Sequence, residues 1–308
     1  MDDKGAAWPQ VPGPGQVFLD HVAWMAADMA AASAVFEDLG FRLTPYSEHG
    51  NRDPETGERR VQGSANRLAM LETGYLEILT TVDGVDTPVS QNIHDSLARY
   101  AGVHLIAFTV ADAEAERPRL GEAGFDLQPT VHLRRDVEAA DGSDAEVAFS
   151  VLRAQFGSIA EGRIQMLTHH TPDHMWQDRY IARDNAIAGL VEVVLAVADP
   201  AASAERLGRF VGRPPEAAAG GAVLSCDRGR LRFMTSAGLA DAFGGLQAPV
   251  EPSTAVLGMA SHDIAATRAF LAERGIIPTI DTADHLLVSP ADACGVAISI
   301  TSLAEWLP

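Results

Sequence analysis

The sequence predicts an α+β fold of four strand-helix-strand-strand-strand (βαβββ) modules, paired into two domains whose curved mixed sheets surround a cleft. The first observation is an internal repeat: residues 28–40, 112–124 and 263–275 each begin with Asp and end with Gly 12 positions later. Residues 199–212 form a fourth copy that is one residue longer. The second observation is that an apolar, strand-like segment precedes each of these four Asp residues. Because internal repeats outweigh other signals in assigning a fold, the chain is interpreted as four copies of one unit.

The residues of the first copy justify each of its predicted elements. Asp28 can cap a helix because its carboxylate accepts hydrogen bonds from the free N–H groups of the first turn, and Gly40 suits the end of that helix. A short connection that contains Gly74 suits a hairpin. The predicted order is a strand at 17–25, a helix at 28–39, a strand at 41–44, a polar surface loop at 46–63 and strands at 66–71 and 75–80.

The other three copies are assigned in the same way. The second follows a linker at 81–100 and is predicted to have a strand at 104–110, a helix at 112–123, strands at 125–131, 146–154 and 163–168, and a charged loop at 132–145. The third is predicted to have a strand at 190–197, a helix at 200–211 and strands at 222–226 and 230–235. The fourth is predicted to have a strand at 254–260, a helix at 263–274 and strands near 276–280, 284–288 and 296–300.

The phase of the repeat divides the chain into domains. Residues 1–15 are rich in Pro and Gly and are expected to form a flexible tail. Residues 16–168 are expected to form a first domain from modules one and two. Residues 169–188 are expected to connect it to a second, degenerate domain at 189–308, which holds modules three and four.

Composition restricts the partners of the chain. Its 308 residues are 47% apolar, which is enough for packed cores, and the formal net charge is -19 with only 23 Lys and Arg residues. Such acidity argues against binding to nucleic acid or to an anionic membrane, because both favour basic surfaces. The acidity is expected to serve solubility, with a cationic ligand as the alternative.

Cysteine usage and the absence of export signals indicate a compartment. Cys226 and Cys294 lack metal-ligand spacing and are expected to be core thiols in a reducing environment. The N-terminal residues lack the pattern of a signal peptide, and no apolar run reaches the roughly 18 residues that a membrane span needs. We therefore expect a cytoplasmic protein that binds a small molecule.

Two motifs within the repeat point to a family. The first copy opens on Leu19-Asp20-His21-Val22 and carries Gly-Tyr-Leu-Glu-Ile-Leu at residues 74–79. With the βαβββ repeat, these motifs resemble the glyoxalase-like branch of the vicinal oxygen chelate (VOC) superfamily. That superfamily includes glyoxalases, extradiol dioxygenases, epimerases and drug-binding resistance proteins, so the resemblance indicates a fold and leaves several chemistries open.

The resemblance implies a metal site made by the first and fourth strands of two neighbouring modules. The family's first-strand ligand lies seven residues before the Asp that opens the helix, and 28 minus 21 gives seven for His21. The matching fourth-strand residue is Glu77, a carboxylate among apolar residues that would be costly to bury without a partner. His21 and Glu77 are therefore the candidate catalytic residues.

The second module departs from the family's metal-binding pattern. His104 lies eight residues before Asp112, so the alternation of a strand predicts that Leu105 faces the cleft unless a bulge intervenes. Gln165 occupies the position of the glutamate that serves glyoxalases as ligand and base. Because a neutral amide cannot accept a proton, true glyoxalase I activity is not expected.

Two hypotheses for the first-domain cleft follow. In the first, a divalent metal such as Fe, Mn, Ni or Zn is held by His21, Glu77, His104 and Gln165. In the second, the cleft is metal-free and binds an organic ligand through His21, Glu77 and the candidate substrate-binding residues Asn66, Arg67, Gln165 and His169. His169 and His170 are adjacent in a strand, so at most one of them can face the cleft.

Each hypothesis for the cleft implies a different function. The chain is expected to act on a small oxygen-bearing organic substrate in the first-domain cleft as a VOC-type lyase, isomerase or dioxygenase. The alternative is a non-catalytic, resistance-type protein that binds a small molecule. Glu192 and Val256 occupy the seven-residue position in the third and fourth modules, so at most one ligand survives there. The second domain is expected to close the cleft or to support a homodimer.

Overall fold

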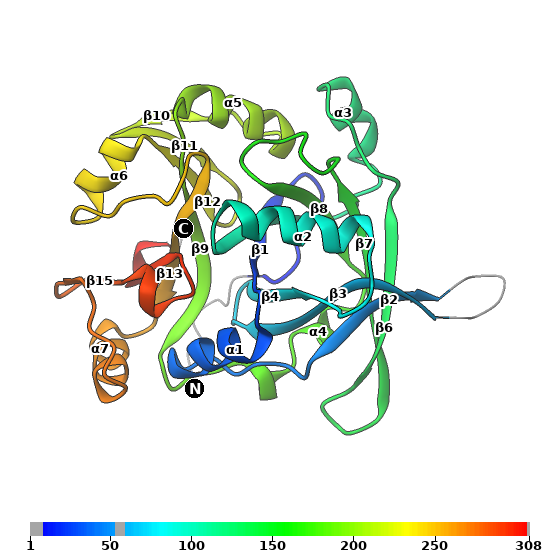
Figure 1. The fold of residues 1–308 in the computed structure, drawn as a ribbon, viewed down its shortest axis with the longest axis horizontal. Helices are drawn as coiled ribbons and strands as arrows, with labels where there is room; N and C mark the ends of the chain where they lie inside the picture. The colour runs from blue at the N-terminus through cyan, green and yellow to red at the C-terminus, as the bar shows by residue number, and fades with distance from the viewer. Residues whose placement is uncertain (1–8, 53–58, 307–308) are drawn as a thin grey trace.

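The computed structural model describes residues 9–52 and 59–306, and two eight-stranded mixed sheets account for most of the fold (Figure 1). The strands of the first sheet all come from the first half of the chain. In order across the sheet they are β2 (Ser47–Arg52), β3 (Arg59–Met70), β4 (Tyr75–Thr81), β1 (Val17–Met25), β5 (Gly102–Val110), β8 (Arg163–His169), β7 (Asp144–Arg153) and β6 (Val131–Glu138).

The second sheet repeats this order with the strands of the second half. Across the sheet they are β10 (Glu216–Ala218), β11 (Gly221–Ser225), β12 (Arg230–Met234), β9 (Ile187–Ala196), β13 (Ser253–Ser261), β16 (Ala297–Ser302), β15 (His285–Val288) and β14 (Ile280–Asp281). In both sheets the two central strands are antiparallel, and each pairs in parallel with the fourth strand of its own module. The predicted α+β fold of four modules in two curved sheets is confirmed.

The central strands explain why the repeat is so apolar in sequence. Every residue of β1, β5, β9 and β13 is buried, because both faces of each strand are covered. One large apolar cluster includes residues of both halves, such as Leu19 and Leu190. A smaller cluster lies in each sheet, around Leu105 with residues of α2 in the first and around Val256 with residues of α6 in the second.

Three of the four predicted helices begin where the sequence predicts, and three further helices are present among the described residues. They are α1 (Met29–Asp38), α2 (Pro88–Arg99), α3 (Arg117–Glu122), α4 (Pro172–Met175), α5 (Pro200–Val211), α6 (Ser236–Ala242) and α7 (Ile264–Glu273). Asp28, Asp199 and Asp263 each accept backbone N–H groups of the following turn, as N-caps do. Asp112 also accepts two N–H groups, but only a turn follows it and the helix begins at Arg117. None of the described helices is long and apolar enough to cross a membrane.

Several segments predicted as loops are regular structure. The predicted loop at 46–63 contains β2 and the start of β3, with residues 53–58 outside the described part, and the charged loop at 132–145 contains most of β6. β6 alternates exposed and half-buried residues at the edge of the sheet, so its polar side chains resemble a loop in sequence. The expected strand at 41–44 is reduced to one β-bridge, at Leu43. The expected strand at 125–131 is reduced to one β-bridge, at Leu127, and to its last residue, which begins β6.

Three of the described helices were missed. α2 lies in the supposed linker at 81–100, where Thr87 and Ser90 form a capping box around Pro88. α6 follows β12, and Thr235 caps it by accepting the N–H of Gly238. The short α4 lies within the predicted connector at 169–188. None of the three follows an Asp of the repeat, so the repeat phase alone does not reveal them.

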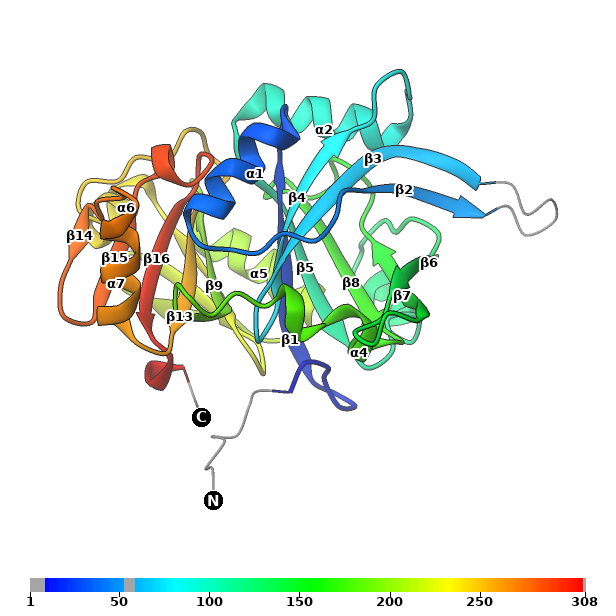
Figure 2. The same cartoon turned by 90° about the horizontal axis from the view of Figure 1, so that it is seen from below.

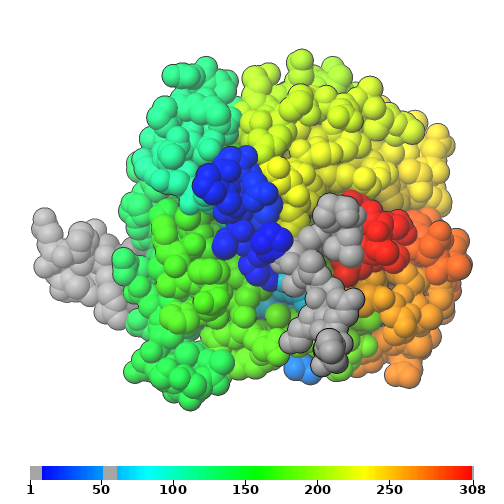
Figure 3. All heavy atoms as spheres, turned by 180° about the vertical axis from the view of Figure 1, so that it is seen from behind, coloured from blue at the N-terminus to red at the C-terminus, as the bar shows by residue number. Residues whose placement is uncertain are grey.

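The two halves meet where β1 and β5 of the first lie beside β9 and β13 of the second (Figure 2). A bridge between Phe18 of β1 and Arg228, just before β12, joins them. The backbone N–H of Leu19 donates to the carbonyl of Arg228 at 2.8 Å, and the Arg228 guanidinium donates back to the Leu19 carbonyl at 3.1 Å. Arg228 also donates to the carbonyl of Pro9, which belongs to the predicted tail at 1–15, of which residues 1–8 lie outside the described part. In Figure 3 the blue N-terminal segment accordingly lies over the junction between the two halves.

Candidate functional site

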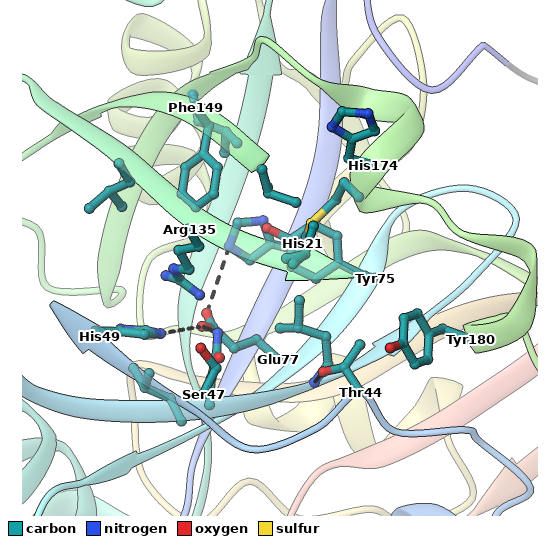
Figure 4. Close-up of a pocket in the computed structure, with 18 of the residues that line it drawn as sticks. His21, Thr44, Ser47, His49, Tyr75, Glu77, Arg135, Phe149, His174 and Tyr180 are labelled. Carbon is teal, nitrogen blue, oxygen red and sulfur yellow. Dashed lines mark hydrogen bonds and ion pairs between the residues drawn. The ribbon is translucent and has the colours of Figure 1, made fainter. Parts of the chain in front are cut away.

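A cavity of about 480 Å³ lies on the first sheet, beside the apolar cluster around Leu105 (Figure 4). Its walls come from strands of both modules and from α4. The polar part of the lining includes His21, Glu77 and Gln165, while Leu105 and Phe149 belong to an apolar part. The cavity therefore occupies the position that the sequence predicts for the cleft.

His21 reaches the cavity from β1 with the support of a buried carboxylate. Its Nδ1 lies 2.6 Å from Oδ2 of Asp20, and the other oxygen of Asp20 lies 3.0 Å from Nε2 of His169. Neighbours in a regular strand point to opposite faces, but β1 has a bulge here. Leu19 pairs with Phe108 and His21 with Ala107, so Asp20 is the extra residue.

The ionised state of Asp20 determines which nitrogen of His21 meets the cavity. Burial acts to raise the pKa of Asp20, but the charges and hydrogen bonds of His169 and His21 hold this pKa well below its ordinary value. A carboxylate can only accept hydrogen bonds, so this network assigns a proton to Nδ1 of His21. Nε2, the other ring nitrogen, faces the cavity and is the atom that carries the lone pair of a neutral imidazole in this tautomer. The ring of Tyr75 stacks on the His21 imidazole, with the two centroids 4.2 Å apart.

Glu77 lies across the cavity floor from His21. Its Oε2 is 3.9 Å from Nε2 of His21, and its Oε1 accepts a hydrogen bond from Nδ2 of Asn66 at 2.6 Å. On the other side, Nε2 of His49 lies 4.0 Å from Oε1 of Glu77. Burial and the positive charge of Arg135 lower the pKa of His49 well below its ordinary value, so this imidazole is neutral. One carboxylate thus lies between two imidazoles.

Two arginines lie in the same cavity wall, on β7 and β8. Nε of Arg153 donates to Oε1 of Gln165 at 3.2 Å. Burial and the charge of Arg163 lower the pKa of Arg153 to about 9, and burial lowers the pKa of Arg163 to about 10, while Glu77 acts in the opposite direction on both. Although the chain as a whole is acidic, this part of its cavity presents positive charge.

The donor atoms do not fit the four-ligand metal site that the family resemblance implies. The four equivalent positions hold His21, Glu77, Leu105 and Gln165, so an apolar side chain replaces one ligand. The oxygen of Gln165 accepts from a guanidinium, Arg153, which would repel a cation bound nearby. Within residues 9–52 and 59–306, no three His, Cys, Asp or Glu side chains are grouped so as to hold a metal ion.

His104 lies away from the cavity, whereas Leu105 lines it, as the one-residue shift predicts. Ala23 pairs with Leu105 and Trp24 with Val103, so His104 is itself the extra residue of a bulge. Its Nε2 lies 2.9 Å from the carbonyl of Tyr100, and burial lowers its pKa to about 4. The bulge does not turn His104 toward His21, so His104 is not positioned as a metal ligand.

Two candidate substrate-binding residues also lie outside the cavity. Asn66 lines it, but its neighbour Arg67 points to the other face of β3, where its Nε donates to the carbonyl of Thr44 at 3.0 Å. His169 lies behind the wall and contacts Asp20. His170 turns the other way and pairs with Ser150 at 2.8 Å, in agreement with the expected alternation.

The sequence interpretation missed several residues of the site, namely Asp20, His49, Tyr75, Arg153 and Arg163. For Asp20 a signal was present, since 20 plus 84 gives 104 and places Asp20 and His104 at the same position of the repeat. His49 and Arg153 could not be found in this way, because they lie on strands whose register the sequence does not fix.

The second sheet has a smaller cavity of about 210 Å³ at the equivalent place. Glu192 stands where His21 stands in the first sheet, and Oε1 of Glu192 accepts from Nε of Arg230 at 2.5 Å and from Nε of Arg232 at 3.1 Å. The register of β9 with β12 places Arg232 at the position of Glu77. An internal ion pair thus occupies the polar positions of the second cavity.

Comparison with known proteins agrees with this fold. A profile of the glyoxalase-like domain matches residues 19–211, which is more than half of the chain, so the chain belongs to this family of the VOC superfamily. The match begins in β1 and includes every residue discussed for the first cavity. A search of curated proteins finds no match.

Three solved structures share the fold at low sequence identity. A hypothetical protein from Staphylococcus aureus has a TM-score of 0.65 at 10% identity, with 93% of this chain and 100% of that chain covered. A variant of 4-hydroxymandelate synthase from Streptomyces coelicolor has a TM-score of 0.57 at 14% identity, with 93% and 92% covered. A fusion of a xylose isomerase-like TIM barrel with 4-hydroxyphenylpyruvate dioxygenase has a TM-score of 0.52 at 13% identity, with 97% and 51% covered. At these identities the likeness is one of fold.

Proposed function

We propose that the cavity of the first sheet is an active site that moves a proton on a small oxygen-bearing organic substrate, as a VOC-type isomerase or lyase. The observation that carries this proposal is the 2.6 Å contact between Asp20 and Nδ1 of His21, which directs Nε2 of His21 into the cavity. A general base must present a lone pair within reach of the proton that it accepts, and a carboxylate on its other nitrogen stabilises the imidazolium that forms.

The proposed step is removal of a proton from carbon next to a substrate carbonyl. The C–H bond breaks, the proton goes to Nε2 of His21, and the electron pair becomes the C=C bond of an enolate whose oxygen carries the negative charge. The side-chain N–H groups of Gln165 and Arg153 lie in the wall and are the donors available to that oxygen. Return of the proton to the neighbouring carbon completes an isomerisation, and loss of a leaving group completes an elimination.

Glu77 is the second group that could carry a proton. Its carboxylate lies 3.9 Å from Nε2 of His21, so the two side chains could act at adjacent atoms of one substrate. Asn66 donates to one oxygen of Glu77 and leaves Oε2 on the His21 side. Glu77 thus supplies a carboxylate that can accept a proton, which the neutral amide of Gln165 cannot do.

Proton exchange in D2O tests the proposal without knowledge of the natural substrate. Pyruvate, 2-oxobutyrate and the methylglyoxal-glutathione hemithioacetal would each be incubated with the protein, and loss of C–H signals followed by NMR. We expect exchange with at least one of them, and its loss in His21→Gln with the circular dichroism unchanged. Binding of these compounds with no exchange and no product after long incubation would instead favour the non-catalytic alternative.

A further inference from the structure

We infer that Arg153 and Arg163 form a binding site for the carboxylate of a small organic acid with an apolar body. The inference rests on the proposed function, because it names the substrate class for the same cavity. Its test measures binding, however, and requires no turnover. The two guanidinium groups, the neighbouring acids and the apolar wall of the cavity each contribute one step to the argument.

Arg163 carries donors that no described residue accepts. Its Nε and Nη1 are shielded from solvent and have no hydrogen-bond partner among the described residues. Its guanidinium lies 5.1 Å from the ring centroid of Phe156 and lines the cavity. A shielded cationic group without hydrogen-bond acceptors is unfavourable, because its lost hydration is not replaced. An anion in the cavity would supply the missing acceptors.

Arg153 adds a second guanidinium that is also incompletely satisfied. The side chain is 9% exposed, and its one hydrogen bond to a described residue goes from Nε to Gln165. The charge of Arg163 contributes to lowering the pKa of Arg153, which means that the two cations are close enough to repel each other. A bound carboxylate would offset this repulsion, and its two oxygens match the fork of a guanidinium.

Two acids of the cavity, Glu77 and Glu138, have partners other than these two arginines. Glu77 is bonded to Asn66 and faces His21, and Glu138 is paired with Arg179 at 2.7 Å. Glu77 still raises the pKa of both Arg153 and Arg163 from a distance. Its negative charge also favours a singly charged carboxylate over a doubly charged phosphate at this place.

The apolar part of the lining, much of which shares β7 and β8 with the two arginines, determines the rest of the ligand. Leu105, Leu133, Phe149, Val151 and Leu167 line the cavity, and most of them belong to one buried apolar cluster. A volume of about 480 Å³ fits a small molecule. A ligand that places its carboxylate on the arginines would therefore place an apolar chain or ring against these side chains, with its central atoms near His21 and Glu77.

Binding of matched acids and amides tests this inference. Benzoate and hexanoate would be compared with benzamide and hexanamide by calorimetry and by the shift in Tm, with inorganic phosphate as a further probe. We expect the carboxylates to bind and to raise Tm, the amides to bind at least tenfold more weakly, and phosphate not to compete. Arg163→Met and Arg153→Met should each weaken carboxylate binding about tenfold or more, since each removes a charge-assisted pair.

Control variants keep the result interpretable. Arg134→Met removes an exposed arginine of β6 that pairs with Glu146 outside the cavity, and it should bind carboxylates as the wild type does. If a Met variant fails to fold, Arg163→Lys and Arg153→Lys retain the charge but lose the fork, and they should show intermediate affinity.

Three results would overturn the inference. These are equal binding of acids and amides, unchanged affinity in both Met variants, and binding of phosphate without binding of either acid. The proposed function fails separately. Arginine-dependent binding with no proton exchange would refute the enzyme alone, while His21-dependent exchange without preference for acids would refute the carboxylate site alone.

Discussion

Oδ2 of Asp20 lies 2.6 Å from Nδ1 of His21, the next residue in the chain. In a regular strand these side chains would point to opposite faces, and the bulge at Asp20 brings them to one side. The same carboxylate contacts His169, which belongs to the other module of the sheet. The orientation of His21 therefore depends on residues that do not touch the cavity.

Asp20→Asn should slow proton exchange about 10- to 100-fold, the range typical for loss of a group that orients a reactive histidine. Asn has the size of Asp but offers an N–H to one of the two histidines, so His21 would no longer be held with Nε2 unprotonated. The measurement is the rate of C–H exchange in D2O, with the circular dichroism as a check on folding. Asp28→Asn is the control, since Asn is an equally good N-cap and Asp28 lies outside the cavity. Equal exchange rates in Asp20→Asn and the wild type would contradict this role.

His104 should make the protein less stable as the pH falls below 6.5. The pKa of His104 in the folded state is about 4 because burial disfavours the imidazolium, whereas its ordinary value is 6.5. Between these values the unfolded chain binds more protons, so the stabilising contribution is present above pH 6.5 and is lost as the pH falls toward 4. The expected loss between pH 7 and pH 5 is about 2 kcal/mol.

Urea unfolding at pH 7 and pH 5 measures this effect. His104→Gln retains an N–H donor for the carbonyl of Tyr100 but does not titrate, so its free energy of unfolding should fall about 2 kcal/mol less over the same interval. The comparison with wild type cancels the other titrating groups. An identical pH dependence in both proteins would show that His104 is already protonated in the folded state, or is accessible to water.

Restoring the family's ligand positions should create a metal site. The double change Leu105→His and Gln165→Glu would place four donors at the positions now held by His21, Glu77, Leu105 and Gln165. We expect this variant to bind Ni²⁺ or Zn²⁺ at least about tenfold more tightly than the wild type, as judged by calorimetry and elemental analysis. His104→Ala should leave metal binding unchanged, because His104 does not face the cavity.

Gln165→Glu also tests the missing base. Loss of a positioned base typically costs about 10² to 10⁴ in rate, so the single change should raise any hemithioacetal isomerase activity above that of the wild type. The readout is product formation from methylglyoxal and glutathione. Strong wild-type activity that Gln165→Glu leaves unaffected would mean that Gln165 does not occupy the base position.

The ion pair in the second sheet should be structural. Glu192→Gln leaves Arg230 and Arg232 without the carboxylate that both contact, and we expect a loss of about 1 to 3 kcal/mol in the free energy of unfolding. This value is below the roughly 3 to 5 kcal/mol for fully buried pairs, because both arginines are partly exposed. Carboxylate binding in the first cavity should be unchanged, and a large loss of binding would indicate that the second cavity takes part in it.

The repeat predicts the fold because each copy carries its own start signal. Asp28, Asp199 and Asp263 cap helices after buried strands, and these local rules are read directly from sequence. The edge strand β6 was missed because Arg135 interrupts the alternation of Val131, Leu133 and Val137, and polar residues fill the exposed positions. Pairing with β7 makes it a strand, and such pairing is not a local property of the sequence.

The candidate site was predictable only in part. His21 and Glu77 follow from spacing within the repeat, and the one-residue shift placed Leu105 correctly in the cavity. Arg153 and Arg163 were not found because the sequence does not show which arginines lack a carboxylate partner in the folded protein. That depends on the position of Glu77, which is bonded to Asn66 after folding.

The bulge at Asp20 occurs in all four copies of the module. The register shifts of the central strands make the residue eight positions before the capping Asp the extra one each time, and these residues are Asp20, His104, Val191 and Ala255. The same bulge thus holds a polar side chain in two copies and an apolar side chain in the other two. The irregularity is therefore a property of the module's backbone that does not depend on the side chain at this position. Of the four positions only Asp20 carries a carboxylate, and the contact with its neighbour His21 depends on this one residue.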